Sequence, residues 1–403
     1  MSEPKITVII PTRERGDVLE KSLLTVTAQD YNNLDIIVSD NFSSDNTEDV
    51  VRSANDARVK YFNTGKRLSM SHNWEFALSN VADDGWVTII GDDDGLLPGS
   101  LKKIAEIIKS TDVQAIRTSV CSYAWPSLTG KQFGRLGVPL KSGHEIRKSK
   151  LWLSKVLSGD SKYTELPMLY NGGFVNMSVL KQLKSKTGSV YRSCIPDVYS
   201  AVAISSIIDR YIYSHEPLAI NGASRHSTGT SQFATKDKSE LSPADRFASE
   251  GNIPFHKDLP LCADGSYPKS LQAMVYESYL QSRCLRGGAK ESIHAEQLEV
   301  ILETSGKHDF AIGEWGEEFA RKHGLDYDVI LAKASRKKTV LGVVSIPSRI
   351  SRAMNIYSVG SPEEPIKDIY EAAMAAAVIR DNMPGRIKQL RRLFERAVKK
   401  VLK

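Results

Sequence analysis

Three adjacent aspartates, Asp92, Asp93 and Asp94, are the residues of this sequence best suited to bind a metal ion. Neighbouring carboxylates repel one another unless a cation or water relieves the repulsion, and Mg²⁺ and Mn²⁺ take oxygen ligands that often include phosphate oxygens. A solvated turn that caps the next helix is the alternative. Because the cluster follows the apolar run at residues 86–90, we expect it to hold Mn²⁺ or Mg²⁺ at the end of a strand.

Asp40 and Asn41 form a second polar pair, which follows the apolar run at residues 34–38. A uracil ring presents one N–H donor between two carbonyl groups, so a carboxylate or amide oxygen would pair with it. An Asx turn is the alternative. The carboxyl ends of parallel strands meet at one edge of a sheet, so we expect this pair to lie beside the aspartate cluster.

Two cationic side chains are candidates for contact with phosphate. Arg67 follows a glycine and a lysine, and it would either reach a phosphate or serve as an ordinary solvated loop residue. His226 lies where the last strand of the domain is expected to return toward the aspartates. It would be a further ligand of the metal or diphosphate, or an ordinary surface or core histidine.

Strands and helices must bring these residues together, and the apolar pattern predicts both. Apolar runs of strand length alternate with stripes of helical spacing as far as about residue 109. In order, the pattern predicts strands at 5–10, 34–38, 59–62 and 86–90, and helices at 17–29, 70–81 and 98–109. This alternation indicates a doubly wound α/β sheet, in which ligands bind beyond the carboxyl ends of the strands.

The remainder of the chain is less regular. Residues 123–169 show little periodicity, which is typical of a functional loop or lid, or of elements that the pattern does not reveal. Further elements are expected at 171–175, 197–208, 211–220, 270–285 and 291–303. We therefore expect an α/β domain at 1–255, a helical extension at 256–360, and C-terminal helices at 361–403 that end in a basic amphipathic tail.

The charge of the chain is concentrated in this tail. Of the 403 residues, 41% are hydrophobic and 25% are charged, which suits a chain that buries a core without disulfides. Residues 385–403 hold eight Lys or Arg and one Glu, so the net charge of +6 leaves −1 for the rest of the chain. No nucleic-acid partner is therefore expected. The tail would lie on an anionic membrane, or pack on the protein or a partner.

The N-terminal start and the apolar runs bear on location. The first residues lack the basic and then apolar pattern of a secretory signal, and no run approaches the roughly 18 apolar residues of a spanning helix. We therefore expect a cytoplasmic protein with peripheral contact to the inner face of the membrane through residues 385–403. Nothing in the sequence sets the oligomeric state.

The N-terminal part of the sequence resembles the family 2 glycosyltransferases, which have the GT-A fold that binds nucleotide sugars. Six segments carry the resemblance, in the order found in the family: residues 8–13, 22–24, 29–31, 36–45, Asn73 and 90–98. The resemblance implies a nucleotide site formed by Pro11, Thr12, Arg13, Asp40, Asn41, Arg67, Asn73 and Asp92. It also implies that Asp93, with Asp94 next to it, binds the metal that bridges the diphosphate. Gly91 stands where the family signature usually begins with Asp, and Asn41 replaces a frequent second Asp.

The resemblance also assigns the groups that act on the acceptor. The inverting members of the family use a carboxylate near the start of a later helix as general base, and Asp197 matches it, with Pro196 in place of a Glu. The alternative for Asp197 is a helix N-cap. Gly172 and Gly173 permit close backbone approach, and in the family such a strand borders the acceptor pocket.

These inferences predict an inverting, metal-dependent glycosyltransferase. It would move a sugar from a nucleotide-diphospho-sugar, a UDP-sugar, to a hydroxyl group of a glycan or lipid-linked saccharide, in polysaccharide assembly for the cell envelope. A sugar-nucleotide nucleotidyltransferase is one alternative, although its glycine-rich loop is missing before Gly16. A non-catalytic glycan-binding protein on the same fold is another. Dinucleotide oxidoreductases and P-loop NTPases are disfavoured because their glycine motifs are absent from the sequence.

Overall fold

Short runs rich in Ile and Val form the parallel half of a large sheet. The computed structural model describes residues 3–127, 133–227, 250–287, 293–305, 310–337, 355–361 and 364–382. Four parallel strands lie in the order β3-β2-β1-β4: β1 Ile6–Thr12, β2 Leu34–Asp40, β3 Val59–Asn63 and β4 Trp86–Ile89. Strand β1 lies between β2 and β4, and it is buried along almost its whole length. Burial on both faces explains why such a run is apolar throughout.

The other half of the sheet is mixed. Its strands are β5 Gly95–Leu96, β6 Ala115–Ala124, β7 Leu136–Pro139, β8 His144–Lys148, β9 Gly173–Asn176, β10 Arg210–Ala223 and β11 Ile356–Val359. Strand β9 runs antiparallel to both β4 and β6 and so joins the two halves. Strand β10 runs parallel to β6 and antiparallel to β5 and β8. Within the described residues, the result is one sheet of eleven strands.

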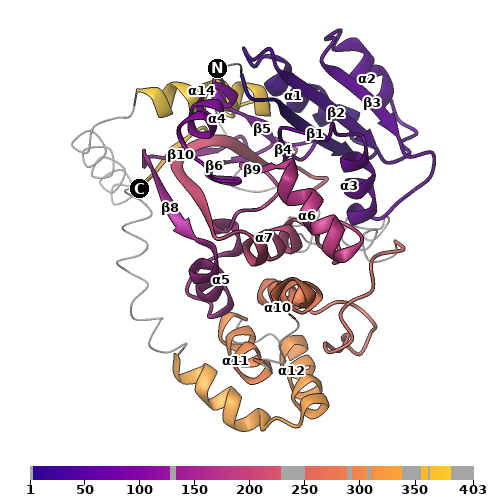
Figure 1. Cartoon of the computed structure of the whole chain (residues 1–403), viewed down its shortest axis with the longest axis vertical. Coiled ribbons are helices and arrows are strands. Elements are labelled where there is room, and N and C mark those ends of the chain that lie inside the picture. The colour runs from indigo at the N-terminus through magenta and orange to yellow at the C-terminus, as the bar shows by residue number, and fades with distance from the viewer. Residues whose placement is uncertain are drawn as a thin grey trace.

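Helices cover both faces of this sheet (Figure 1). Helices α1 Gly16–Thr27, α2 Thr47–Ser53 and α4 Ser100–Ser110 share one apolar cluster with the strands. Helices α3 Met70–Ser79, α6 Met177–Thr187 and α7 Pro196–Ile207 share a second cluster, on the opposite face. Helix α14 Ile369–Asp381 packs beside α1, where Ile369 and Val18 belong to one buried cluster.

A helical extension follows the sheet and has its own apolar core. It contains η2 Arg283–Arg286, α10 Leu271–Gln281, α11 His294–Thr304 and α12 Phe310–His323, and α5 Ser149–Leu157 and η1 Tyr163–Glu165 lie at its junction with the sheet domain. Helix α10 connects the two cores, because its Val275 packs with Val198 and Val202 of α7. Figure 1 shows α10 between α7 and the pair α11 and α12.

The structure confirms the expected α/β class, with a doubly wound mixed sheet and a helical C-terminal extension. Residues 123–169 contain β7, β8 and α5, so this segment holds unrecognised elements and not only a loop. Helix α2, seven residues long, was not predicted. The domain boundaries at 255 and 360 remain predictions, and the basic tail 385–403 lies outside the described residues.

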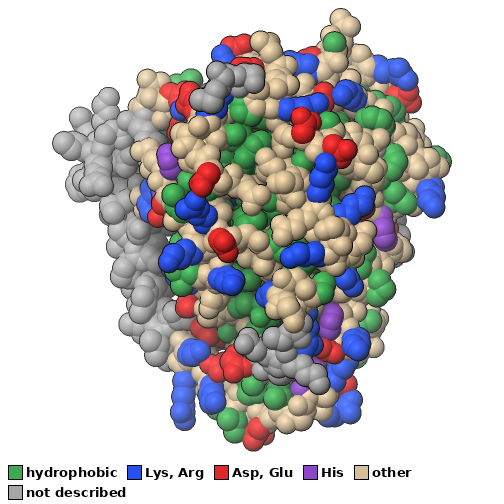
Figure 2. Space-filling view, in the orientation of Figure 1, with side chains coloured by type: hydrophobic (Ala, Val, Ile, Leu, Met, Phe, Trp, Pro, Cys, Tyr) green, Lys and Arg blue, Asp and Glu red, His purple; other side chains and the backbone are tan. Residues whose placement is uncertain are grey.

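The surface and the helices add two further observations. Figure 2 shows Lys and Arg side chains interspersed with Asp and Glu side chains over the visible face. Among the helices that the structure describes, none combines the length and apolar character needed to cross a membrane.

Close backbone approach at Gly173 is required where β9 meets the preceding loop. A Cβ atom on Gly173 would lie 1.7 Å from the carbonyl oxygen of Met168, which is backbone and cannot rotate away. Gly251 offers a matched comparison, because a Cβ atom there would meet no heavy atom within 4 Å.

We predict that Gly173→Ala lowers the free energy of unfolding by about 1–3 kcal/mol, because the added methyl group overpacks the junction between β9 and the loop. Gly251→Ala should change it by less than about 0.5 kcal/mol. Chemical denaturation followed by circular dichroism measures both. Equal stability of the two variants would contradict the close approach.

Candidate active site

The carboxyl ends of β1, β2 and β4 bring the polar residues together. Thr12 at the end of β1 lies opposite Asp40 at the end of β2. On the other side of β1, the backbone N–H of Ile90 donates to the carbonyl of Ile9 at 3.0 Å. Residues 91–94 therefore lie beyond β4 at the same edge as Thr12 and Asp40, as the strand pattern predicts.

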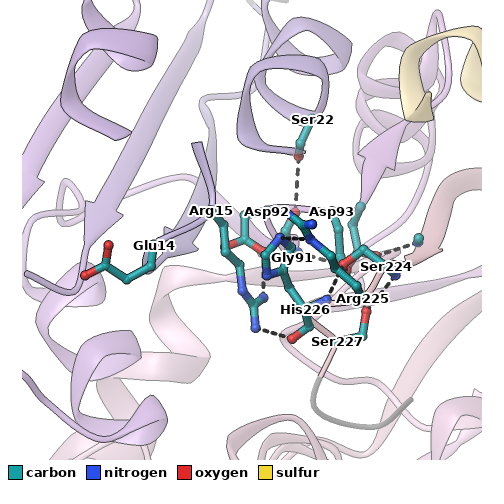
Figure 3. Close-up of polar contacts among 12 residues, drawn as sticks. Glu14, Arg15, Ser22, Gly91, Asp92, Asp93, Ser224, Arg225, His226 and Ser227 are labelled. Carbon is teal, nitrogen blue, oxygen red and sulfur yellow. Dashed lines mark hydrogen bonds and ion pairs between the residues drawn. The ribbon is translucent and has the colours of Figure 1, made fainter. Parts of the chain in front are cut away.

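Asp92, which is buried, forms an ion pair with the partly exposed Arg15, whose Nη1 lies 2.8 Å from Oδ1 of the aspartate. Burial raises the pKa of Asp92, Arg15 opposes this rise, and the charge of Asp93 adds to it. Burial acts to lower the pKa of Arg15, but Asp92 and Asp93 together raise it. Arg15 also donates to the backbone carbonyl of His226 (Figure 3). The sequence did not single out Arg15, since a loop arginine is usually solvated.

Asp93 is held by two serines that follow β10. The hydroxyl groups of Ser224 and Ser227 each donate to Oδ2 of Asp93 at 2.6 Å. The indole N–H of Trp125 donates to the backbone carbonyl of Asp93 at 2.9 Å. These contacts, part of which Figure 3 shows, fix the middle aspartate from the far half of the sheet.

Asp94 accepts the most hydrogen bonds of the three aspartate side chains. Its Oδ1 accepts from the backbone N–H of Gly222 at 2.8 Å, and its Oδ2 accepts from the N–H of Gly91 at 2.9 Å and from the hydroxyl of Tyr170 at 2.8 Å. Burial raises the pKa of Asp94 to about 7, and the charge of Asp93 adds to the rise. A carboxyl group in this environment is a poor candidate for a further strong ligand.

Whether a metal ion fits depends on which carboxylate oxygens already accept hydrogen bonds from the protein. Both oxygens of Asp94 and one oxygen of Asp93 accept hydrogen bonds from the protein, whereas Oδ1 of Asp93 accepts none from the described residues. Within the same residues, no group of three His, Cys, Asp or Glu is arranged to hold a metal ion. The site fits a divalent ion that takes most of its ligands from a bound diphosphate and one from Asp93. It does not fit an ion held by the protein alone.

His226 lies next to this cluster in the chain, but its ring faces another way. Nε2 of His226 lies 3.0 Å from Oδ2 of Asp17, and it accepts from Nε of Arg225 at 3.2 Å. In the described part of the chain, the ring therefore contacts Asp17 and Arg225, and the aspartate cluster is contacted by the neighbouring serines instead. Its predicted role as a metal or diphosphate ligand remains a prediction.

Asp40 and Asn41 hold the loops that follow β2 and β3. Oδ2 of Asp40 accepts from the hydroxyl of Tyr61 at 2.6 Å and from the amide of Asn63 at 3.0 Å. The side chain of Asn41 accepts from the backbone N–H of Leu68 at 2.8 Å and donates to its carbonyl at 2.7 Å. Both side chains thus shape the rim of the site, and the predicted contact with a base remains a prediction.

Both arginines of the predicted nucleotide site have carboxylate partners. Arg13 pairs with Glu250, and Arg67 pairs with Glu14. Glu14 has a left-handed backbone with φ of 52°, and its carboxylate accepts from the backbone N–H of Ser44 at 3.1 Å. It points away from the aspartate cluster in Figure 3. A phosphate group that binds either arginine would compete with these carboxylates for the guanidinium group.

Asn73 and Pro11 occupy positions behind the rim. The side-chain oxygen of Asn73 accepts from the hydroxyl of Ser39 at 2.8 Å, and both groups are buried. Pro11 lies in β1 opposite Ser39 in β2. Asn73 therefore attaches α3 to the end of β2, so any effect on a nucleotide would pass through the position of that strand.

Asp197 lies in the first turn of α7, where Pro196 is tolerated because it needs no hydrogen-bond partner for its nitrogen. The hydroxyl group of Tyr163 donates to Oδ2 of Asp197 at 2.8 Å. Burial raises the pKa of Asp197, and the hydrogen bond from Tyr163 acts in the opposite direction. Burial and then the charges of Asp94, Asp93 and Asp197 raise the pKa of Tyr170 well above its usual value. Tyr170 is thus within electrostatic reach of both the cluster and Asp197.

A buried arginine shapes the loop that carries these tyrosines. Arg117 in β6 donates to the backbone carbonyl of Thr164 at 2.7 Å and to that of Asn171 at 2.6 Å. Gly172 has φ of +85°, and a Cβ atom there would lie 2.8 Å from side-chain atoms of β6. Gly172 and Gly173 therefore permit the close packing that the sequence predicts, and contact with an acceptor remains a prediction. The sequence alone does not single out Tyr163, Tyr170 or Arg117, because no local motif marks them.

Glu277 of α10 supports the loop that leads into α7. Its Oε2 accepts from the hydroxyl of Ser193 at 2.5 Å, and its Oε1 accepts from the amide of Gln281 at 2.8 Å. The side chain is completely buried, and burial raises its pKa to about 7. The helical extension therefore holds the segment four residues before Asp197.

Comparison with known proteins finds similarity in the N-terminal region of the chain. The model of glycosyl transferase family 2 matches residues 7–161. The Campylobacter jejuni enzyme GalNAc(5)-diNAcBac-PP-undecaprenol beta-1,3-glucosyltransferase is 34% identical over 155 residues, which are 38% of this chain and 48% of that protein. An uncharacterized glycosyltransferase of Mycoplasma pneumoniae is 28% identical over 123 residues, which are 28% of this chain and 39% of that protein. The chain thus spans less than half the length of these curated relatives.

A solved structure is similar at a lower level. S. aureus TarS 1-349 in complex with UDP-GlcNAc has 14% identity and a TM-score of 0.46, and the match covers 83% of this chain and 92% of that chain. The fold of this chain is an α/β sheet with buried carboxylates beyond the ends of its parallel strands. The matched region, residues 7–161, contains the aspartate cluster, so this part of the chain is similar to glycosyl transferase family 2.

The buried position of Glu277 predicts a dependence of stability on pH. Its pKa in the folded protein, about 7, lies above the ordinary value of 4.5, so the folded state binds its proton more tightly than the unfolded state. This contribution to the free energy of unfolding is fully present below about pH 4.5 and is lost as the pH rises toward about 7.

We predict that the free energy of unfolding of Glu277→Gln, relative to that of the wild type, rises by on the order of 2 kcal/mol between about pH 4.5 and pH 8, because glutamine does not titrate. Urea denaturation at the two pH values measures the difference. The exposed Glu296→Gln is the matched control. Parallel pH profiles of wild type and Glu277→Gln would show that the raised pKa is wrong.

Proposed function

We propose that the protein is an inverting glycosyltransferase that moves a sugar from a UDP-sugar to a hydroxyl group of a glycan or lipid-linked saccharide. The observation that carries the proposal is the buried aspartate cluster with Arg15 at the carboxyl edge of the sheet, within electrostatic reach of Asp197 through Tyr170. The family match over residues 7–161 supports it. The C. jejuni relative is named as an enzyme that acts on a saccharide linked to undecaprenol through diphosphate. This name supports a lipid-linked saccharide as the acceptor.

The donor would bind along the ends of β1, β2 and β4. Pro11, Thr12 and Asp40 would border the nucleotide, as the resemblance implies, and Arg15, which lies beyond β1, would add a positive charge beside the diphosphate. A bound Mn²⁺ or Mg²⁺, held by Asp93 and the donor, would supply positive charge that stabilises the diphosphate as it leaves.

Asp197 would act as the general base. Its carboxylate would accept the proton of the acceptor hydroxyl while that oxygen forms a bond to the anomeric carbon of the donor. The bond from the anomeric carbon to the diphosphate oxygen breaks in the same step, and UDP leaves on the opposite side, which inverts the configuration. The hydrogen bond from Tyr163 fixes one carboxylate oxygen, and the raised pKa makes Asp197 a stronger base than a solvated aspartate.

Contact with a membrane would bring the protein to a lipid-linked acceptor. We propose that the basic tail 385–403 provides peripheral contact with an anionic surface, on the charge pattern of the sequence alone. The tail lies outside the described residues, and its alternative of packing on the protein or a partner stays open.

We predict that Asp197→Asn lowers the rate of UDP release from UDP-sugars by at least about 100-fold, since the amide cannot accept a proton. A coupled assay of UDP, run with and without a saccharide acceptor, measures the rate. The control is Asp209→Asn, an exposed residue just beyond the end of α7. Full activity of Asp197→Asn would exclude it as the base, and release of pyrophosphate by the wild type would favour a nucleotidyltransferase.

We predict that Asp93→Ala removes most of the enhancement of UDP affinity by Mn²⁺, on the order of 10-fold or more, because the proposed protein ligand is lost. Calorimetric titration of UDP with and without Mn²⁺ measures it, with GDP and dTDP as tests of the base. Asp84→Ala, which removes an exposed carboxylate before β4, is the control. An unchanged Mn²⁺ effect in Asp93→Ala would exclude Asp93 as the ligand.

A further inference from the structure

A cleft of about 530 Å³ opens beside the candidate active site, between α3 and the helical extension. Residues of α3, of the loop before α7, of the segment 253–257 and of the end of α10 line it. The residues that line it are Ser71, His72, Glu75, Ser189, Tyr191, Arg192, Ile253, Pro254, Phe255, His256, Lys257 and Gln281. This volume is in the range of small-molecule sites, roughly 300–1,000 Å³.

The cleft is connected to the active site through an aromatic wall. The ring of Tyr191 meets that of Trp74 edge-on, with centroids 5.8 Å apart. Trp74 stacks on Tyr170 at 5.2 Å, and Tyr170 donates to Asp94. At its other end, the segment that lines the cleft begins next to Glu250, which pairs with Arg13 at the rim of the donor site. The wall of the cleft and the candidate active site therefore share packed aromatic side chains.

The charges that face the cleft are mainly positive. The carboxylate of Glu75 accepts from the backbone N–H groups of Val190 at 2.9 Å and Tyr191 at 3.1 Å, which partly neutralises it. Arg192 and Lys257 have no carboxylate partner among the residues that the structure describes, and the nearest polar contact of Arg192 is the sulfur of Cys284 at 3.9 Å. Two unpaired cations on one cleft favour an anionic ligand.

The remaining lining suits a sugar ring. Tyr191, Ile253, Pro254 and Phe255 offer apolar and aromatic surface, and hydroxyl, imidazole and amide groups lie beside them. Phe255 is held in place by Tyr267, with ring centroids 5.1 Å apart. An apolar surface with a few polar groups binds the flat face of a saccharide while its hydroxyl groups find partners.

We propose that this cleft binds the acceptor as a phosphorylated saccharide, with its phosphate or diphosphate group between Arg192 and Lys257 and its sugar against Tyr191 and Phe255. The proposal rests on the proposed function, because it places the acceptor beside the donor. Arg192 lies five residues before Asp197, and the loop between them is anchored to α3, where the hydroxyl of Ser71 donates to the carbonyl of Ser193 at 2.6 Å. Phosphate bound by Arg192 would thus orient the sugar relative to the base.

Three probes test the chemistry: N-acetylglucosamine 1-phosphate, the octyl diphosphate ester of N-acetylglucosamine, and the neutral octyl N-acetylglucosaminide. Each is titrated calorimetrically into the full chain saturated with UDP, so that the donor site is filled. We expect the wild type to bind the phosphorylated probes at least about 10-fold more tightly than the neutral one. A preference for the diphosphate indicates a lipid-linked acceptor, and equal binding of both phosphorylated probes indicates a phosphorylated glycan.

Variants then assign the preference to the cleft. The double variant Arg192→Gln, Lys257→Gln should abolish the preference for phosphorylated probes, and Lys257→Gln alone should reduce this preference. Arg192→Lys should retain most of the preference because the positive charge remains. The double variant Lys333→Gln, Arg336→Gln removes two exposed cations of the same extension and should leave it unchanged. Lys257 is exposed, so its single variant is expected to fold.

The experiments distinguish a failure of the cleft proposal from a failure of the proposed function. A wild type that neither binds UDP nor releases UDP from UDP-sugars overturns the proposed function, whatever the cleft binds. A wild type that binds UDP but binds no probe, or does not prefer the phosphorylated probes, overturns the cleft proposal alone. A preference for phosphorylated probes that is unchanged in both Lys257→Gln and the double variant Arg192→Gln, Lys257→Gln also overturns the cleft proposal.

Discussion

Repulsion among three buried carboxylates is the constraint on which this end of the molecule depends. Their charges cannot be relieved by bulk water, so the protein must supply a compensating group for each one. It does so from three parts of the chain: an arginine after β1, a tyrosine before β9, and two serines with a backbone N–H from the end of β10. The carboxylates therefore connect the two halves of the sheet through their hydrogen bonds and the ion pair with Arg15.

The helical extension contributes to this site as well as to the size of the protein. Helix α10 packs on α7 and holds the loop before Asp197 through Glu277. The same helix and the segment before it form one side of the cleft next to the donor rim. The extension thus helps to determine the position of Asp197 and the shape of the cleft, while the sheet positions the aspartate cluster.

Local pattern reveals much of the fold but only part of the site. The strands at β1, β2 and β4 are predictable because burial on both faces makes them mostly apolar, and the cluster at Asp92 follows from its place after such a run. Ser224 and Ser227 lie 131 and 134 residues from Asp93, so only the folded chain brings them together. Arg15 and Tyr170 carry no sequence signal for the same reason. Strands β7 and β8 were missed because one is short and the other is largely exposed.

The pairing of late segments with early ones has a consequence for synthesis on the ribosome. Strand β11 completes one edge of the sheet against β7, and α14 covers apolar residues of α1 and β6. Tyr123 also donates to the carbonyl of Ile366 at 2.8 Å. The nascent chain must therefore keep that surface exposed until residues near 380 leave the exit tunnel, which makes the partly synthesised protein a natural client for chaperones that shield apolar surface.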